Sequence, residues 1–145
     1  MKGNTKGGLL ITAVAVLLFF SWPAAGSGTA ESGPVQCDVH AGTCTATIEG
    51  TEVSLNITPK PVKAMHDLVF TVTFAGKKPV IDPYIDLGMP AMNMGRNRVV
   101  LKRVGDSLYQ GKGVIVRCPS GLRTWKARIT APDLGSVEFV FDVIY

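Results

Sequence analysis

Residues 68–74 read Leu-Val-Phe-Thr-Val-Thr-Phe, and this stretch decides the fold class of the chain. Its even-numbered residues are all large and apolar, whereas threonine occupies two of the three odd-numbered positions. Side chains along a strand point alternately to opposite faces, so the stretch predicts a strand with one buried face. We expect Phe70 to lie in the core.

From residue 43 onward, the same two-residue period recurs between turns rich in glycine and proline. This part of the sequence has no long run of apolar residues at helical spacing. An all-β fold is therefore expected, namely an immunoglobulin-like antiparallel β-sandwich of seven to eight strands. Three further aromatic side chains belong to the predicted core: Trp125, Phe139 and Phe141. The other predicted strands cover residues 45–49, 52–57, 81–87, 98–104, 107–116, 125–129 and 137–143.

Two short turns help to set the register of these strands. Gly50 and Thr51 suit a two-residue hairpin with glycine at the first central position, and Gly105 and Asp106 give a second hairpin signal. In the strand over residues 81–87, the period predicts that Ile81, Ile85 and Leu87 point inward. Asp82 and Asp86 then lie on the solvated face.

The N-terminal residues have the order of a secretory signal peptide. Lys2 and Lys6 precede an uncharged stretch over residues 7–20, and small residues follow over 24–30. The apolar run is shorter than the roughly 18 to 20 residues that span a bilayer, which favours cleavage over anchoring. We therefore predict a signal peptide over 1–27, an N-terminal segment over 28–43 that contains Cys37, and the β-sandwich over 44–145.

Composition excludes several classes of protein. The 145 residues are 46% hydrophobic and only 18% charged, which is not the composition of a disordered chain. The formal net charge of +4 includes Lys2 and Lys6, and without them it is too small to indicate nucleic acid or an anionic membrane as a partner. No catalytic motif occurs at a recognisable spacing, so we expect no enzyme.

Three cysteines, Cys37, Cys44 and Cys118, fall in the predicted exported part. An oxidising compartment favours one disulfide and one spare thiol, and three pairings are open. We favour Cys37 with Cys44, because residues 40–43 resemble a tight reversal, although a bridge to Cys118 would tie an early strand to a late one. Cys118 begins a predicted turn over residues 118–121, and a free thiol there is a candidate Cu(I) ligand or redox thiol.

Residues 88–95, Gly-Met-Pro-Ala-Met-Asn-Met-Gly, hold three of the five methionines of the chain. Thioether sulfur is a soft, neutral ligand that suits Cu(I) and needs no deprotonation. Met92 and Met94 point the same way if the segment is extended, and Met89 is either a third ligand or a core residue. The other interpretation is that these methionines fill an irregular sheet edge or form a contact surface.

Met65 and His66 form a second candidate pair, because a thioether beside an imidazole would complete a copper site if their loop lies near the methionine segment. The alternative for His66 is a solvent-exposed loop position, since imidazole serves many roles besides metal ligation.

Several later segments resemble the YtkA-like and FixH-like exported bacterial domains over residues 55–143. These segments are Asp67–Val72, Asp86–Gly95, Tyr109–Gly113 and Gly121–Trp125. The resemblance implies an immunoglobulin-like sandwich in the bacterial periplasm or at the cell surface, near copper handling or terminal-oxidase assembly. It implies that Met89, Met92 and Met94 are the loop methionines and Trp125 the core tryptophan. The three cysteines depart from that pattern, as does the lack of a membrane helix after signal cleavage.

The leading hypothesis is an exported module that binds Cu(I) or another soft metal through its methionine segment, for sequestration or for hand-over to a metal acceptor or envelope protein. The alternative is a structural or protein-interaction module that binds no metal and uses the methionine segment as a contact surface. A thiol redox factor is a third hypothesis, although Cys37 and Cys44 lack the Cys-x-x-Cys spacing that tunes thiol reactivity.

Overall fold

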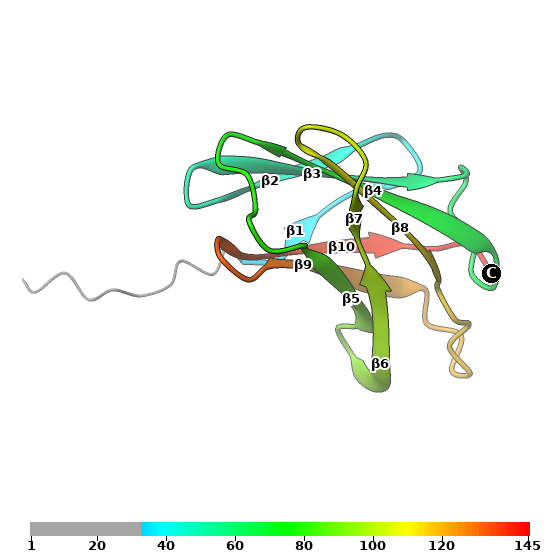
Figure 1. Ribbon diagram of the computed structural model, residues 1–145. Coiled ribbons are helices and arrows are strands. Elements are labelled where there is room, and N and C mark those ends of the chain that lie inside the picture. Colours follow the sequence, from blue (N-terminus) through cyan, green and yellow to red (C-terminus); the bar gives the residue numbers. More distant parts are fainter. Residues whose placement is uncertain (1–32) are drawn as a thin grey trace, which may run out of the picture.

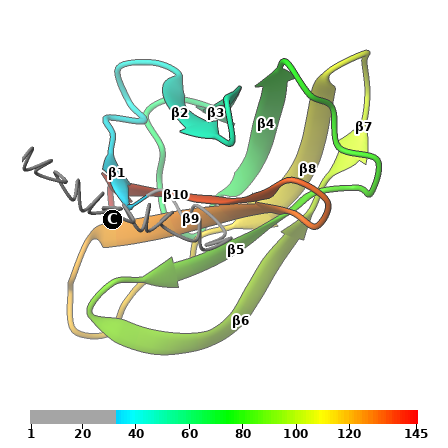
Figure 2. The same ribbon diagram turned by 90° about the vertical axis from the view of Figure 1, so that its left-hand side faces the viewer.

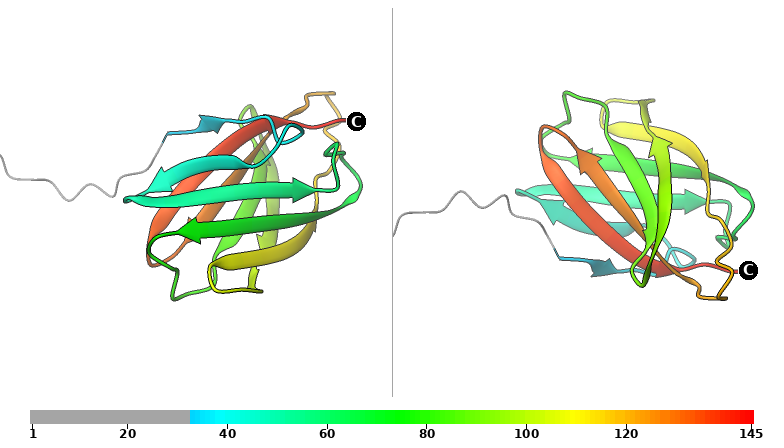
Figure 3. Two further views of the ribbon diagram at one scale, coloured as in Figure 1. Left: turned by 90° about the horizontal axis from the view of Figure 1, so that it is seen from above. Right: turned by 90° about the horizontal axis from the view of Figure 1, so that it is seen from below.

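The alternating segment over residues 68–74 forms most of strand β4 (Asp67–Ala75), the middle strand of one of two five-stranded sheets. The computed structural model describes residues 33–145, and all ten of their regular elements are strands. Figure 1 shows the two sheets as stacked layers, and Figure 3 shows from above and below that their strands cross obliquely. The structure is therefore the all-β sandwich that the two-residue period predicts.

The first sheet has the order β2-β3-β4-β8-β7 and the second sheet the order β1-β10-β9-β5-β6. The strand pairs are antiparallel except β1 with β10, which run parallel (Figure 3, left). Besides β4, the strands are β1 (Val35–Gln36), β2 (Cys44–Ile48), β3 (Thr51–Thr58), β5 (Tyr84–Met89), β6 (Met92–Val100), β7 (Lys102–Arg103), β8 (Leu108–Val114), β9 (Thr124–Ala131) and β10 (Gly135–Asp142). Ten strands exceed the expected seven to eight because β1 and β7 are only two residues long.

The core lies between the two sheets and consists of the inward residues of both. The four aromatic residues expected there, Phe70, Trp125, Phe139 and Phe141, are all buried, with exposed fractions of 0 to 2%. In β4 the inward set is the even-numbered one, as the alternation predicts. Burial of one face of each sheet is the main stabilising contribution of such a sandwich.

Two local predictions were wrong by a small shift. The β2–β3 hairpin turns at Glu49 and Gly50, which both have positive φ (45° and 79°), and Thr51 already belongs to β3. Positive φ at both central positions defines the type I′ turn that matches the twist of a hairpin. Ile81 is exposed because β5 begins only at Tyr84, after a loop whose backbone is held by Asp133.

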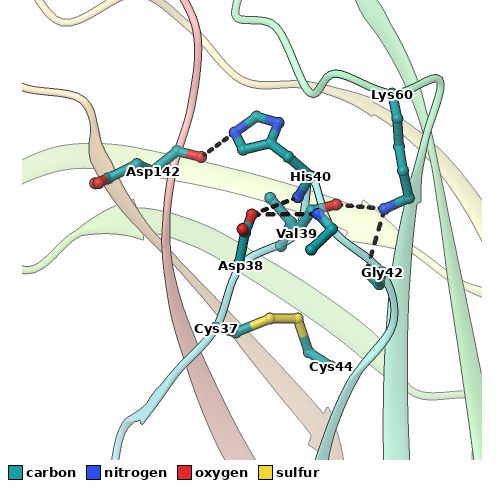
Figure 4. Close-up of a disulfide and its surroundings, with 9 residues drawn as sticks. Cys37, Asp38, Val39, His40, Gly42, Cys44, Lys60 and Asp142 are labelled. Atoms are coloured by element: carbon teal, nitrogen blue, oxygen red, sulfur yellow. Dashed lines mark hydrogen bonds between the residues drawn. A yellow bond between two sulfur atoms is a disulfide. The ribbon is translucent and has the colours of Figure 1, made fainter.

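The disulfide joins Cys37 to Cys44, the pairing favoured from the sequence, with the two Cα atoms 5.9 Å apart (Figure 4). The loop that it closes is pinned to the sandwich through His40. Nε2 of His40 donates to the carbonyl oxygen of Asp142 at 3.0 Å, and Nδ1 accepts from the backbone N–H of Val62 at 3.0 Å. The disulfide loop is thus fixed to the end of β10 and to the β3–β4 connection.

The predicted signal peptide lies outside the described residues. Strand β1 precedes residue 44, so the second sheet already takes up part of the segment over residues 28–43. Residues 33–145 contain no helix of the length and apolar character needed to cross a bilayer.

Three segments that are distant in the sequence meet at one end of the sandwich. The backbone N–H of Ala64 donates to Ile144 at 2.8 Å, and the N–H of Met65 donates to Ile115 at 2.8 Å. The N–H of Val143 donates to Arg123 at 3.0 Å. The loop over residues 115–123, between β8 and β9, therefore lies next to the β3–β4 connection and the last residues of the chain, at the right of Figure 1.

Candidate metal centre

The methionine segment forms the tip of the β5–β6 hairpin, where Pro90 and Ala91 link the two strands. The expectation of a methionine loop is therefore corrected, since Met92 and Met94 both lie within β6. Met89 is directly paired with Met92, after a register shift between Leu87 and Met89. Directly paired residues project to the same face of a sheet, so the two side chains are neighbours.

The three methionines differ in exposure, and the difference separates their roles. Met89 is 4% exposed and belongs to the core. Met94 is partly buried and packs against that core from the position two residues beyond Met92. Met92 is 39% exposed. It is therefore the methionine of this hairpin that an incoming ion reaches most readily.

Cys118 is a free, buried thiol in the β8–β9 loop, with an exposed fraction of 1%. Its Sγ lies 3.4 Å from Sδ of Met92, a residue 26 positions earlier in the chain. The hairpin tip and the β8–β9 loop lie side by side in Figure 2. The fold thus places one thiol and one thioether in contact, with Met94 and Met89 on the same hairpin.

A tight turn shapes the surroundings of this thiol. The backbone N–H of Gly121 donates to the carbonyl oxygen of Cys118 at 3.0 Å, and Gly121 takes the positive φ of 78° that glycine tolerates. Oγ of Ser120 lies 2.9 Å from Cys118 Sγ. This hydrogen bond, aided by backbone N–H groups of residues 120–122, holds the pKa of the Cys118 thiol below its ordinary value, although burial acts in the opposite direction.

The two sulfur atoms suit a soft ion. A thiolate supplies negative charge and a thioether supplies a neutral soft donor, which is the donor set that Cu(I) prefers. Metal–thiolate bonds of about 2.3 Å at tetrahedral or trigonal angles would place two sulfurs roughly 3.8 to 4.0 Å apart. Met92 Sδ would have to withdraw by about half an ångström from its contact with Cys118, which its flexible, half-exposed side chain permits.

Met65 and His66 lie in the β3–β4 connection. Met65 is 64% exposed and has a positive φ of 60°, and its N–H contact with Ile115 places its backbone near the start of the Cys118 loop. His66 donates from Nδ1 to the carbonyl oxygen of Ala64 at 2.8 Å, which leaves Nε2 as the ring nitrogen with a lone pair. Within residues 33–145 no hydrogen bond joins this pair to the methionine hairpin, and its role as a ligand stays a prediction.

Comparison of the chain with known proteins gives no relative: no family model matches it, and neither the curated proteins nor the solved structures include a significant match. In the described part of the chain, no three side chains of the types His, Cys, Asp and Glu are grouped so that they could hold a metal ion. The candidate centre is instead a sulfur site of cysteine and methionine.

Sequence reasoning named both halves of this centre without joining them. The sequence predicts Cys118 either as a disulfide cysteine or, if free, as a Cu(I) ligand. It predicts Met92 as a Cu(I) ligand within the methionine segment. Their contact and the supporting hydrogen bond of Ser120 were missed. The signal that points to Cys118 is the odd cysteine count, because a local Cys37–Cys44 bridge leaves one thiol over.

Proposed function

We propose that this protein is an exported β-sandwich module that binds Cu(I), or a similarly soft ion, between Cys118 and the methionines of the β5–β6 hairpin. The observation that carries the proposal is the 3.4 Å contact between the sulfur atoms of Cys118 and Met92. Soft sulfur donors select Cu(I), and a thiol whose pKa is lowered is more readily deprotonated for binding.

The arrangement favours hand-over of the ion as well as storage. Cys118 is buried and would supply an anionic thiolate ligand, whereas Met92 is more exposed and would supply a neutral thioether ligand. A ligand of an acceptor protein can replace Met92 first while the thiolate retains the ion. Met94, two residues beyond Met92 in the same strand, would serve as the third donor, and Met89 would remain in the core.

The immunoglobulin-like topology and the exported location that we propose are supported by the sequence. The resemblance to YtkA-like and FixH-like domains supports an immunoglobulin-like arrangement in the bacterial periplasm or at the cell surface. The Cys37–Cys44 disulfide agrees with an oxidising compartment. In such a compartment thioethers are durable ligands for a soft ion.

The test is a Cu(I) titration of the protein lacking residues 1–27, against a competing chelator and with Zn(II) for comparison. Saturation at one equivalent is expected, with loss of binding in the double variant Met92→Leu/Met94→Leu and weaker, residual binding by the methionines in Cys118→Ser. Leucine is close to methionine in volume, so the fold should persist. Met65→Leu removes an exposed thioether outside the hairpin and tests the second predicted ligand pair separately. Unchanged affinity in the double variant would refute the proposal and leave the hairpin as a contact surface for a partner protein.

A further inference from the structure

The hydroxyl group of Tyr145 is placed at the loop that carries Cys118. It accepts from the backbone N–H of Cys118 at 3.1 Å and from Nε1 of Trp125 at 3.4 Å, and it donates to the carbonyl oxygen of Leu122. A phenol has one donor and two acceptor positions, so these three bonds use its full hydrogen-bonding capacity.

Two of these bonds hold the ends of the same turn. Cys118 is the first residue of the turn over residues 118–121 and Leu122 follows the turn, so one oxygen atom binds the chain at both ends of it. Arginines flank the turn as well: the guanidinium carbon of Arg117 lies 5.5 Å from the centre of the Tyr145 ring, and that of Arg123 lies 6.0 Å from it. Arg117, Cys118, Leu122 and Arg123 therefore all contact the same side chain, that of Tyr145.

The position of the turn determines the surroundings of the Cys118 sulfur. Ser120, whose Oγ lies 2.9 Å from this sulfur and donates to it when it is a thiolate, lies within the turn. The 3.4 Å contact with Met92 depends on where the turn presents the thiol. A group that holds the turn in place therefore also sets the position of the Cys118 sulfur relative to Ser120 and Met92.

We propose that Tyr145 is a positioning residue of the metal centre, whose hydroxyl holds the Cys118 turn so that the thiolate faces Met92 and Ser120 together. The inference rests on the proposed function in so far as it concerns a metal. Without the hydroxyl, the N–H of Cys118 and the indole N–H of Trp125 lose their shared acceptor, and the turn is free to shift away from the hairpin.

The test is Tyr145→Phe, which keeps the ring between the two arginines and removes only the hydroxyl. In metal-free protein with the disulfide intact, Cys118 is the single free thiol, so its titration is followed directly by thiolate absorbance. We expect a raised thiol pKa. In loaded protein we expect Cu(I) affinity to fall about 10- to 100-fold, the range found for residues that support metal ligands.

Two matched variants complete the experiment. Tyr109→Phe removes another tyrosine hydroxyl, which bonds Arg103 and Pro79 in a different part of the fold, and it should leave the thiol pKa and the Cu(I) affinity unchanged. Ser120→Ala removes a direct donor to the sulfur and should raise the thiol pKa with Tyr145 in place. Thermal unfolding of each variant separates a loss of stability from a change at the site.

A Tyr145→Phe protein with the thiol pKa of the wild type would overturn the inference, whatever its thermal stability. A wild-type protein that takes up no Cu(I) would instead refute the proposed function. In that case the metal-free titration still decides whether Tyr145 positions the thiol, so the two failures are distinct.

Discussion

Cu(I) affinity should depend on pH through a single proton. Of the proposed donors Cys118, Met92 and Met94, only the thiol titrates, because thioether sulfur carries no proton. Below the thiol pKa, each bound ion must displace one proton, so the apparent dissociation constant should fall about tenfold for each unit rise in pH. Above the thiol pKa the affinity should level off. Since the hydrogen bond from Ser120 lowers that pKa, the plateau should begin below the ordinary range of a cysteine thiol.

The assay is an anaerobic competition titration with a chromogenic Cu(I) chelator at a series of pH values, corrected for the protonation of the chelator itself. The plot of the logarithm of the dissociation constant against pH gives the number of protons released as its slope. The control is Cys118→Ser, in which residual binding by the methionines alone should not depend on pH. Ser120→Ala should move the start of the plateau to higher pH, since it removes the hydrogen bond that lowers the thiol pKa.

Two results would contradict binding through a single thiolate. A slope of zero in the wild type would mean that the ion is held by thioethers without the thiolate. A slope corresponding to two protons would mean that a second donor also releases a proton when the ion binds.

Three further predictions concern the scaffold. Gly111→Ala should destabilise the protein by roughly 2 kcal/mol or more, because a Cβ there would overlap a backbone carbonyl of the neighbouring segment, whereas Gly42→Ala, with open space around it, is the matched control in chemical denaturation. Replacing Cys37 and Cys44 together by alanine should cost about 2.5 kcal/mol from the entropy of their short loop, and an unchanged denaturation midpoint would contradict this estimate. Asp133 accepts from two backbone N–H groups of the β4–β5 loop, chiefly that of Val80, which lowers its pKa in the folded state. Its contribution to stability is present above its unfolded pKa and is lost as pH falls through the folded one, so wild type and Asp133→Asn should converge in stability only in strongly acidic solution.

Alternation of residue types was sufficient to predict the layers of this fold. Phe70 and Trp125 are buried as the two-residue period requires, because burial of one face depends on the pattern within a single strand. The turn at Glu49 and Gly50 was placed one residue too late, since glycine at the second central position of a type I′ turn resembles glycine at the first position of a type II′ turn.

The centre could be predicted only in pieces. The chemistry of Cys118 and Met92 is evident from residue type, but their contact joins a loop to a hairpin tip and depends on how β9 pairs with β5. Tyr145 carried no sequence signal at all, because its role arises from hydrogen bonds made across the end of the sandwich. Long-range contacts of this kind are absent from the local periodicity on which the strand predictions depend.

The most direct test of the central claim is X-ray absorption spectroscopy of the protein loaded with one equivalent of Cu(I). We predict a first coordination shell of two or three sulfur atoms at about 2.3 Å, and each of the single variants Met92→Leu and Cys118→Ser should lose one of these sulfurs. A shell made of nitrogen or oxygen, or a sulfur shell that neither substitution changes, would contradict it.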